Sequence, residues 1–271
     1  MAKKASFIEK LLPKSVQNVL WIGLFFCMIA LLFSAVERKR EANANNLKIK
    51  INQLESGNHL ISEQDVEQYL KEYFGFKLEG LNIEELDVDL VEDALLDYPY
   101  IKEAQAYISA KNQLHIKLKQ REPLLRIIDK ANEHYYLSKD GGRVPVSRHF
   151  TARVPVANGA IPKYENGYLN KKKHVLKDLY TLVDFISKDE FLNPMIEQIY
   201  VDKNLEFVLV PKLGKEKIEF GSIEDYQEKF ENLEIFYKEG MRTMGWNKYK
   251  SINLKIDNQV VCEKINTKEN H

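Results

Sequence analysis

The segment 87-DVDLVEDALLDYPYIKEAQAYISAKNQLHIKLKQREPLLRI-127 combines two apolar repeats, and these repeats decide the fold class. Its first part has the three- and four-residue spacing of an amphipathic helix, carried by Val91, Ala94, Leu95 and Tyr98. Asp89 and Glu92 have the spacing of a capping box, and Pro99 ends the helix. Its second part predicts two strands, from Ile101 and from Gln113, because apolar and polar residues alternate in "QLHIKLK". The segment therefore predicts a helix followed by a β-hairpin.

The residues before this segment predict one more strand and one more helix. Leu47, Ile49 and Ile51 alternate with polar residues, as in a half-buried strand. A helix follows that begins at the capping pair Ser62 and Asp65, ends at Gly75, and has an apolar stripe of Val66, Tyr69, Leu70 and Tyr73. The predicted order is β-α-α-β-β, with two helices on one face of a three-stranded sheet.

With this order of elements, the segment resembles the POTRA domain of the bacterial cell-division family FtsQ/DivIB. The resemblance rests on the helix that ends at a proline, the apolar strand after "YPYIKEA", a tight turn, and a strand ending in Arg121-Glu122-Pro123. The turn 109–113 departs from the Arg-x-x-Pro-like turn of many relatives. POTRA modules also occur in outer-membrane assembly proteins, usually in tandem and ahead of a barrel, and this sequence shows neither a second copy nor a barrel series.

A second module follows that reads as short strands and turns. Asp140-Gly141-Gly142 predicts a hairpin turn, and Pro145 predicts that the strand after it is an edge strand. The predicted strands are "LLRIID", "YYL", "RVPV", "RVPVANG", "IEQIYVD", "LEFVLVP" and a last one over Ser251 to Lys264. This order resembles the β-domain that follows the POTRA domain in the same family.

Two helices interrupt these strands. The first has an apolar stripe of Val175, Leu179, Leu182, Val183 and Ile186. The second begins at a predicted cap, Ser222 with Asp225, ends at Gly240, and buries Tyr226, Phe230, Leu233 and Tyr237. We expect these stripes to pack in the core. The predicted fold class is α+β: a transmembrane helix, a POTRA domain, and a mixed β-domain with two helices.

The run 19-VLWIGLFFCMIALLFSAV-36 is uncharged over 18 residues, nearly enough helix to cross a bilayer. A soluble core helix would show a polar face, and a cleaved signal peptide has a shorter apolar stretch and a small-x-small site. Cleavage after Ala35 would place Phe33 where a small residue is needed. We therefore predict a permanent anchor that includes Val19, Trp21, Phe25, Phe26, Leu31 and Val36, with Trp21 in the aromatic belt.

Basic residues flank this run on both sides, so the positive-inside rule gives only a weak indication of the orientation of the helix in the membrane. A short N-terminal tail before a long C-terminal part favours a cytoplasmic N-terminus and an extracytoplasmic bulk. The predicted parts are a cytoplasmic tail 1–18, a transmembrane helix 19–36, a linker 37–46, a POTRA domain 47–121, a β-domain 122–264 and a tail 265–271. The predicted location is the bacterial cytoplasmic membrane at the division septum.

Composition and motifs argue against several functions. Lys+Arg and Asp+Glu both count 40, so we expect no electrostatic preference for nucleic acid. The two cysteines, Cys27 and Cys262, lie in different predicted compartments and exclude a disulfide framework. The six histidines form no H-E-x-x-H pattern, and nucleophile and phosphate-loop motifs are missing. We expect no enzymatic activity, no cofactor, no metal and no small-molecule substrate.

The remaining function is binding to other chains. The resemblance implies that the last strand of the β-domain pairs with a small coiled-coil membrane protein of the FtsB/DivIC type, itself paired with an FtsL-type protein. The predicted edge comprises Ser251, Ile252, Asn253, Leu254, Lys255, Ile256, Val260 and Val261. The alternative for each of these residues is a place in the core sheet. Two other functions stay open: capture of outer-membrane strands by a POTRA protein, and a membrane-anchored cell-wall hydrolase or sensor.

Overall fold

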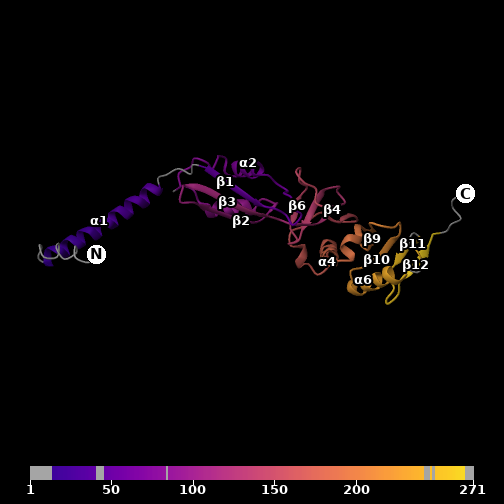
Figure 1. Ribbon diagram of the computed structural model, residues 1–271. Helices are drawn as coiled ribbons and strands as arrows, with labels where there is room; N and C mark the ends of the chain where they lie inside the picture. Colours follow the sequence, from indigo (N-terminus) through magenta and orange to yellow (C-terminus); the bar gives the residue numbers. More distant parts are fainter. Residues whose placement is uncertain (1–13, 41–45, 84, 241–244, 246–247, 266–271) are drawn as a thin grey trace. The chain divides into compact units, whose positions relative to one another are not determined.

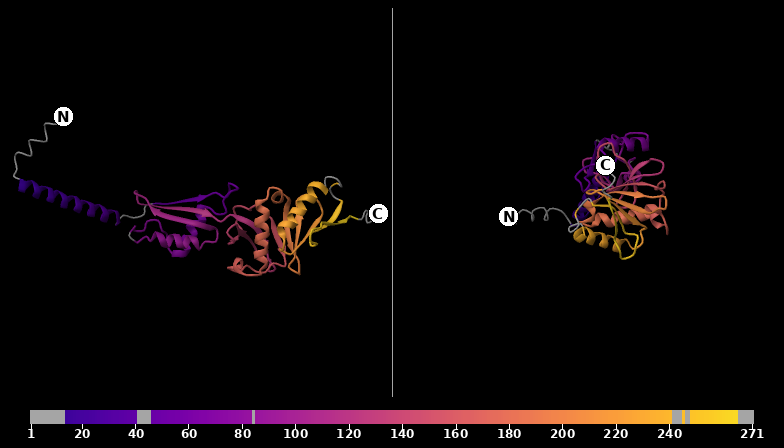
Figure 2. Two further views of the ribbon diagram at one scale, coloured as in Figure 1. Left: turned by 90° about the horizontal axis from the view of Figure 1, so that it is seen from below. Right: turned by 90° about the vertical axis from the view of Figure 1, so that its right-hand side faces the viewer.

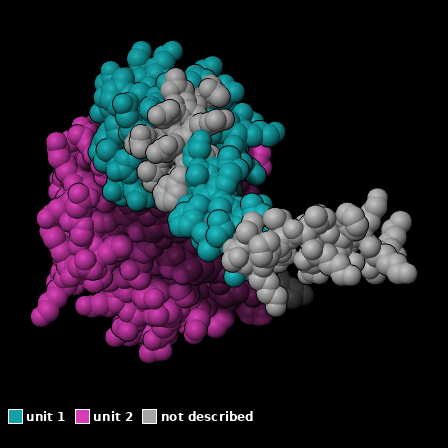
Figure 3. Space-filling view, turned by 90° about the vertical axis from the view of Figure 1, so that its left-hand side faces the viewer, with its two compact units in different colours: residues 1–50, 63–95, 104–117 teal, residues 51–62, 96–103, 118–271 magenta. Residues whose placement is uncertain are grey.

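The computed structural model describes residues 14–40, 46–83, 85–240, 245 and 248–265 (Figure 1). Its contacts divide the chain into two compact units (Figure 3). Unit 1 contains residues 1–50, 63–95 and 104–117, and unit 2 contains residues 51–62, 96–103 and 118–271. The predicted tails and linker fall largely on residues outside the described ranges, so those domain boundaries stay predictions.

The first helix, α1 (Lys14–Arg40), extends beyond both ends of the predicted anchor. Large apolar side chains along it are exposed, among them Val19, Trp21, Phe25, Phe26 and Leu31. The side chain of Val36 lies outside the described part of this helix. Within the described residues, no helix combines the length and the apolar character needed to cross a membrane.

The β-α-α-β-β order predicted for the first module is confirmed. Its elements are β1 (Asn46–Asn52), α2 (Glu63–Phe74), α3 (Val88–Leu96), β2 (Ile101–Ile108) and β3 (Gln113–Gln120). The three strands form one sheet in the order β1-β3-β2. The helices bury most of the predicted stripes, since Val66 and Leu70 of α2 and Val91, Ala94 and Leu95 of α3 are all at most 1% exposed. The spacing of these residues thus translates directly into one apolar face on each helix. Tyr69 and Tyr98 are only partly buried, and the prediction for Tyr73 is wrong, because its side chain is 48% exposed.

The predicted capping pair of α3 is wrong. The carboxylate of Asp87, one residue before the helix, accepts hydrogen bonds from the backbone N–H groups of Asp89 (3.1 Å) and Leu90 (3.2 Å). The carboxylate of Glu92 instead accepts the backbone N–H of Ala106 in β2 at 2.5 Å. An acidic residue that reaches a neighbouring strand in this way is indistinguishable, by spacing alone, from one that caps its own helix.

Unit 2 is built around one nine-stranded sheet in the order β12-β11-β10-β9-β8-β7-β4-β5-β6. In Figure 2 its pink strands and its yellow hairpin stand at opposite ends. The strands are β4 (Pro123–Ile128), β5 (His134–Ser138), β6 (Arg143–Pro145), β7 (Val156–Gly159), β8 (Ile196–Val201), β9 (Phe207–Pro211), β10 (Lys217–Gly221), β11 (Tyr249–Asn253) and β12 (Val261–Lys264).

Two sequence predictions for this sheet are confirmed. Gly141, between β5 and β6, has φ 79°, a conformation that glycine adopts without strain. Pro145 lies in β6, the edge strand at one end of the sheet. A proline lacks the N–H that a further strand would need, so this edge is unsuited to strand addition.

Helices cover one face of the sheet. The chain adds η1 (Tyr168–Asn170), α4 (Val175–Lys188), α5 (Leu192–Met195), α6 (Tyr226–Ile235) and η2 (Phe236–Gly240). Leu179, Leu182 and Ile186 of α4 and Phe230 and Leu233 of α6 share one buried cluster with the inward side chains of the strands. The predicted cap at Asp225 is wrong, because this residue adopts φ 51° and its side chain makes no capping hydrogen bond.

Candidate partner-binding edge

The C-terminal end of the sheet is a hairpin, not the single strand predicted over Ser251 to Lys264. β11 pairs in parallel with β10 and antiparallel with β12. Within the described residues, β12 pairs with β11 alone and forms the edge of the sheet. The backbone of Ser251–Asn253 is therefore paired on both sides, and the open row of N–H and C=O groups belongs to β12.

The registers show which side chains share a face. Ile252 is fully buried and lies opposite Cys262, so these two residues point toward the core. Ser251 lies opposite Glu263, and Asn253 lies opposite Val261. Because side chains alternate along a strand, these four residues share the outer face. The outer face continues into β10, where Lys217 and Glu219 lie opposite Ser251 and Asn253.

The apolar residues of the predicted edge fall into three groups. Ile252 and Leu254 are at most 2% exposed and support the hairpin from the core. Val260 is partly buried and packs against the same core cluster. Ile256 and Val261 are 46% and 44% exposed, which makes them the large apolar side chains that this end of the sheet presents to solvent together with Ile265.

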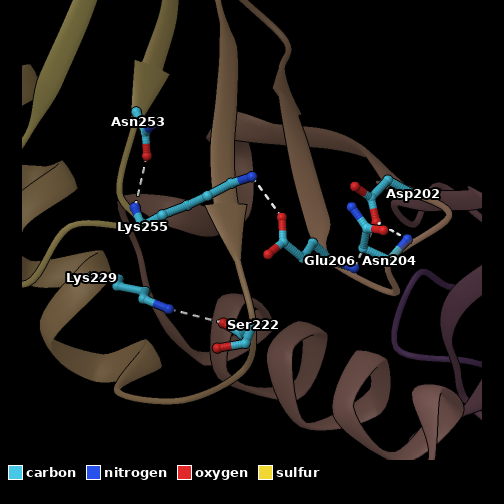
Figure 4. A network of polar contacts seen from close by, with 7 residues as sticks. All are labelled: Asp202, Asn204, Glu206, Ser222, Lys229, Asn253 and Lys255. Carbon is cyan, nitrogen blue, oxygen red and sulfur yellow. Dashed lines mark hydrogen bonds and ion pairs between the residues drawn. The ribbon is translucent and has the colours of Figure 1, made fainter.

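A polar network connects the segment after β11 to the neighbouring β8–β9 turn (Figure 4). Lys255 Nζ donates to Glu206 Oε2 at 2.6 Å, and this hydrogen bond raises the pKa of the Lys255 ammonium. Asn253 Oδ1 accepts the backbone N–H of Lys255 at 2.9 Å. Glu206 is itself positioned by Asp202, whose Oδ1 accepts the backbone N–H groups of Asn204 (2.8 Å) and Glu206 (2.9 Å). The chain that leaves β11 is thus held by hydrogen bonds from two directions.

Helix α6 supports the same region with a partly buried cation. Lys229 Nζ donates to the carbonyl oxygen of Ser222 at 3.0 Å (Figure 4) and lies 5.3 Å from the ring centroid of Phe220. Burial lowers the pKa of the Lys229 ammonium. The ammonium ties the first turns of α6 to the residues that follow β10, the strand that β11 pairs with.

Cys262 lies on the core-facing side of β12 and is partly buried. Burial raises the pKa of its thiol, which lowers the fraction of reactive thiolate at neutral pH. A free cysteine of this kind is compatible with an oxidising compartment.

Sequence reasoning missed several residues at this site. β10 was not predicted, because "KIEFG" is short and directly follows the turn-rich "KLGKE". Glu206 was also missed, although the Asx turn at Asp202 that positions it belongs to a turn type with a recognisable sequence signal. Glu263 and Lys264 of the edge strand carry charge at the position where natural sheets discourage aggregation.

Among the described residues, no group of three or more His, Cys, Asp or Glu side chains is placed to hold a metal ion. The arrangement that the described residues do form is an edge strand with exposed apolar side chains on a hairpin held by hydrogen bonds, a geometry to which an extended segment can add as a further strand.

Fold and edge together define a class: proteins in which one POTRA-like domain precedes a mixed-sheet domain that ends in a strand hairpin. Residues 42–119 match the POTRA-like domain, and residues 122–263 match the family described as FtsQ/DivIB, C-terminal related. Since the second match covers more than half of the chain, the protein belongs to the FtsQ/DivIB family. The two matched families consist of non-catalytic scaffold domains. No curated protein matches the chain.

Proposed function

We propose that this division-related scaffold is anchored in the cytoplasmic membrane by α1 and recruits other division proteins at the septum through its extracytoplasmic units. The proposed partners are small membrane proteins of the FtsB/DivIC type together with FtsL-type proteins. Membrane anchoring is supported by the 18 uncharged residues from Val19 to Val36 and by the exposed apolar side chains on the described part of that run. Tethering to one membrane raises the local concentration of partners, so individually weak contacts suffice.

The observation that carries the recruitment proposal is the unpaired edge of β12. An incoming extended segment would pair with the backbone of Val261–Lys264, the β12 strand. Val261 and Glu263 are on the outer face of β12 and would then contact alternate side chains of the added strand, whereas Ser251 and Asn253 are on β11, one strand further from it. Ile252, Leu254, Lys255 and Val260 would act indirectly, by holding the hairpin in place, and Ile256 would extend the apolar contact beyond the strand.

Site-specific photocrosslinking in growing cells tests this assignment. A photoreactive amino acid at Val261 is expected to capture a small membrane protein, and one at Leu213 is the matched control because Leu213 is 73% exposed in the β9–β10 turn. Equal adducts from both positions, or lipid adducts alone from position 261, would show that β12 is not the binding edge.

A charge at the edge provides a second test. Val261→Lys places an ammonium where an added strand would lie, a device that natural edge strands use against pairing. We expect recovery of the partner to fall about tenfold, which corresponds to roughly 1.4 kcal/mol of binding free energy. Leu213→Lys should leave recovery unchanged.

Depletion of the protein separates the division scaffold from the two other functions. Filamentous cells are the expected result, because septum assembly would stop while growth continues. Loss of outer-membrane barrels without filaments would favour strand capture, and altered wall cleavage in normally dividing cells would favour a hydrolase or sensor.

A further inference from the structure

Exposed aromatic rings gather where α2 ends in unit 1. In the segment 69-YLKEYFGFKL-78, Tyr73 is 48% exposed and Phe76 is 49% exposed. The half-buried Phe74 lies between them, with ring centroids 5.1 Å from Tyr73 and 5.9 Å from Phe76. Scattered exposed apolar side chains are ordinary on protein surfaces, whereas contiguous ones mark an interaction site.

The backbone holds these rings outward. Gly75 has φ 78°, and its N–H donates to the carbonyl oxygen of Lys71 at 2.9 Å, so the helix ends in a glycine turn. Leu78 is 5% exposed and returns the chain to the core. Phe76 therefore lies on a short turn between two fixed points, and its exposure follows from the geometry of the helix end.

This turn lies beside the start of the first strand. Leu47, the second residue of β1, lines the same open groove as Lys71, Lys77 and Leu78. Five residues separate Arg40, the end of α1, from Asn46, so this link spans at most about 22 Å. Arg40 itself is four residues beyond the uncharged run, or about 6 Å along a helix. The aromatic turn is thus tethered within reach of any surface from which α1 emerges.

The chemistry of the turn suits the headgroup layer of a bilayer. Tyrosine and phenylalanine rings partition into this layer, and lysine side chains extend from it toward anionic headgroups. Lys71 and Lys77 are exposed beside the rings. The groove also contains Glu67, Glu72 and Glu79, so the rings, and not net charge, supply most of the attraction. Five charged side chains of both signs fit a hydrated headgroup layer better than the dry centre of a protein interface.

We infer that Tyr73, Phe76, Lys71 and Lys77, here named the interfacial patch, rest in the headgroup layer of the membrane that holds α1. The inference depends on the proposed anchoring by α1. Its consequence is that unit 1 is held at the membrane surface by a second contact, which restricts the directions that the chain beyond it can explore.

Fluorescence quenching in vesicles tests the inference on the full chain. The protein is reconstituted into phosphatidylcholine–phosphatidylglycerol vesicles that contain a lipid with a nitroxide near the headgroup. An environment-sensitive fluorophore is attached at Phe76→Cys in a Cys27→Ser, Cys262→Ser background, and Tyr73→Cys provides a second position. The matched control is Leu213→Cys, since Leu213 is more exposed but lies in unit 2.

We expect quenching at positions 73 and 76 to exceed that at position 213 by about twofold or more, with a blue-shifted emission. A variant with Lys71→Gln and Lys77→Gln should reduce the quenching at position 76 in anionic vesicles more than in purely zwitterionic ones. Equal, water-like emission at positions 73, 76 and 213 would overturn the inference.

The native cysteine in the uncharged run distinguishes this failure from a failure of anchoring. Labelled at Cys27 alone, in a Cys262→Ser variant, the chain should be quenched by a lipid with its nitroxide deep in the acyl layer. Quenching at Cys27 without quenching at positions 73 and 76 would overturn the interfacial patch alone. No quenching at Cys27 would overturn the anchor and the patch together.

Discussion

Gly159, at the end of β7, shows how a single backbone position can govern the sheet of unit 2. Its φ is +102°, and a Cβ atom there would lie 2.2 Å from the carbonyl oxygen of Val201 and 2.9 Å from the Tyr200 ring. That carbonyl oxygen accepts the N–H of Ala160 at 2.8 Å, next to the Gly159–Val201 register pair. Neither the strain nor the contact is visible in "VPVANG", where the glycine reads as an ordinary strand end.

We expect Gly159→Ala to lower the free energy of unfolding by about 3 kcal/mol, from left-handed strain and from displacement of β8. Gly167→Ala is the control, because Gly167 also has positive φ but nothing lies within 4 Å of its added Cβ, so about 1–2 kcal/mol is expected. Urea unfolding of the full chain measures both. If both variants lost the same free energy of unfolding, β8 would be able to shift away from the added Cβ at position 159 without cost, and the close contact would not contribute to stability.

Tyr237, a residue of η2, forms a buried hydrogen-bonded pair with Glu216. Tyr237 Oη donates to Glu216 Oε1 at 2.7 Å, and Glu216 is 1% exposed. Tyr237→Phe leaves a buried carboxylate without this donor, which should cost about 1–3 kcal/mol at pH 7. Tyr168→Phe is the matched control, because the buried Tyr168 hydroxyl has no hydrogen-bond partner among the described residues. Thermal or urea unfolding should show little loss for that variant, and a similar loss in both would contradict the assigned role of the pair.

The same tyrosines predict a pH dependence. Burial raises the pKa of Tyr237, with a further contribution from its hydrogen bond to Glu216, and burial also raises the pKa of Tyr135 and Tyr168. Above pH of about 10 the unfolded chain ionises these phenols while the folded chain retains the protons. The unfolded state then binds fewer protons, so the free energy of unfolding should fall as pH rises, by up to about 1.4 kcal/mol per pH unit for each tyrosine. Each Tyr→Phe variant should flatten this alkaline slope, as measured by urea unfolding between pH 8 and pH 11; an unchanged slope would contradict it.

At the scale of elements, helix α4 begins at an unusual cap. His174 Nδ1 accepts the backbone N–H of Leu176 at 3.2 Å, so an imidazole nitrogen takes the place that a serine or aspartate oxygen usually fills. His174→Ala should lower the free energy of unfolding by about 1 kcal/mol, and His174→Asn should retain most of it. Chemical unfolding at pH 7.5 measures the difference, and equal stability of the alanine and asparagine variants would exclude the cap.

The periodicity of apolar residues predicted most elements correctly, and local polar signals predicted their ends poorly. In four elements the spacing of apolar residues places them on a single face in only one type of secondary structure, and these elements are β1, α2, β3 and α4. The cap at Asp89 and Glu92 failed because Glu92 bonds to β2, and the cap at Asp225 failed because that residue takes a left-handed conformation. Side-chain hydrogen bonds depend on which strand packs nearby, and spacing contains no information about that.

The prediction of the sheet edges was limited in the same way, because the edges depend on how the strands pair. Pro145 identified one edge correctly, because proline excludes a neighbour by its own chemistry. The opposite edge was predicted over Ser251–Ile256 with Val260 and Val261; β12 covers β11 there, and of the predicted residues Val261 lies in the edge strand. Strand order is a property of long-range pairing, so alternation along "SINLKI" cannot show whether one neighbour or two flank it.

At the scale of the whole molecule, each compact unit buries its own apolar residues, and we expect destabilisation to stay local. Leu95 of α3 and Leu182 of α4 are both fully buried, in unit 1 and unit 2 respectively. Leu95→Ala and Leu182→Ala should each cost about 3 kcal/mol. Amide hydrogen exchange should accelerate in α2 and α3 for the first variant and in β8 and β9 for the second. Acceleration across both units in either variant would show that they unfold as one.

The sequence alone determined the uncharged run, the β-α-α-β-β order, the two helical stripes of the β-domain and the family resemblance, because each depends on residue type and spacing along the chain. Tertiary structure alone decided that β10 joins the sheet, that β12 is its edge among the described residues, and that the end of α2 lies beside Leu47. These features arise from contacts between residues distant in sequence. The proposed binding surfaces are of this second kind, since a surface consists of whatever packing leaves uncovered.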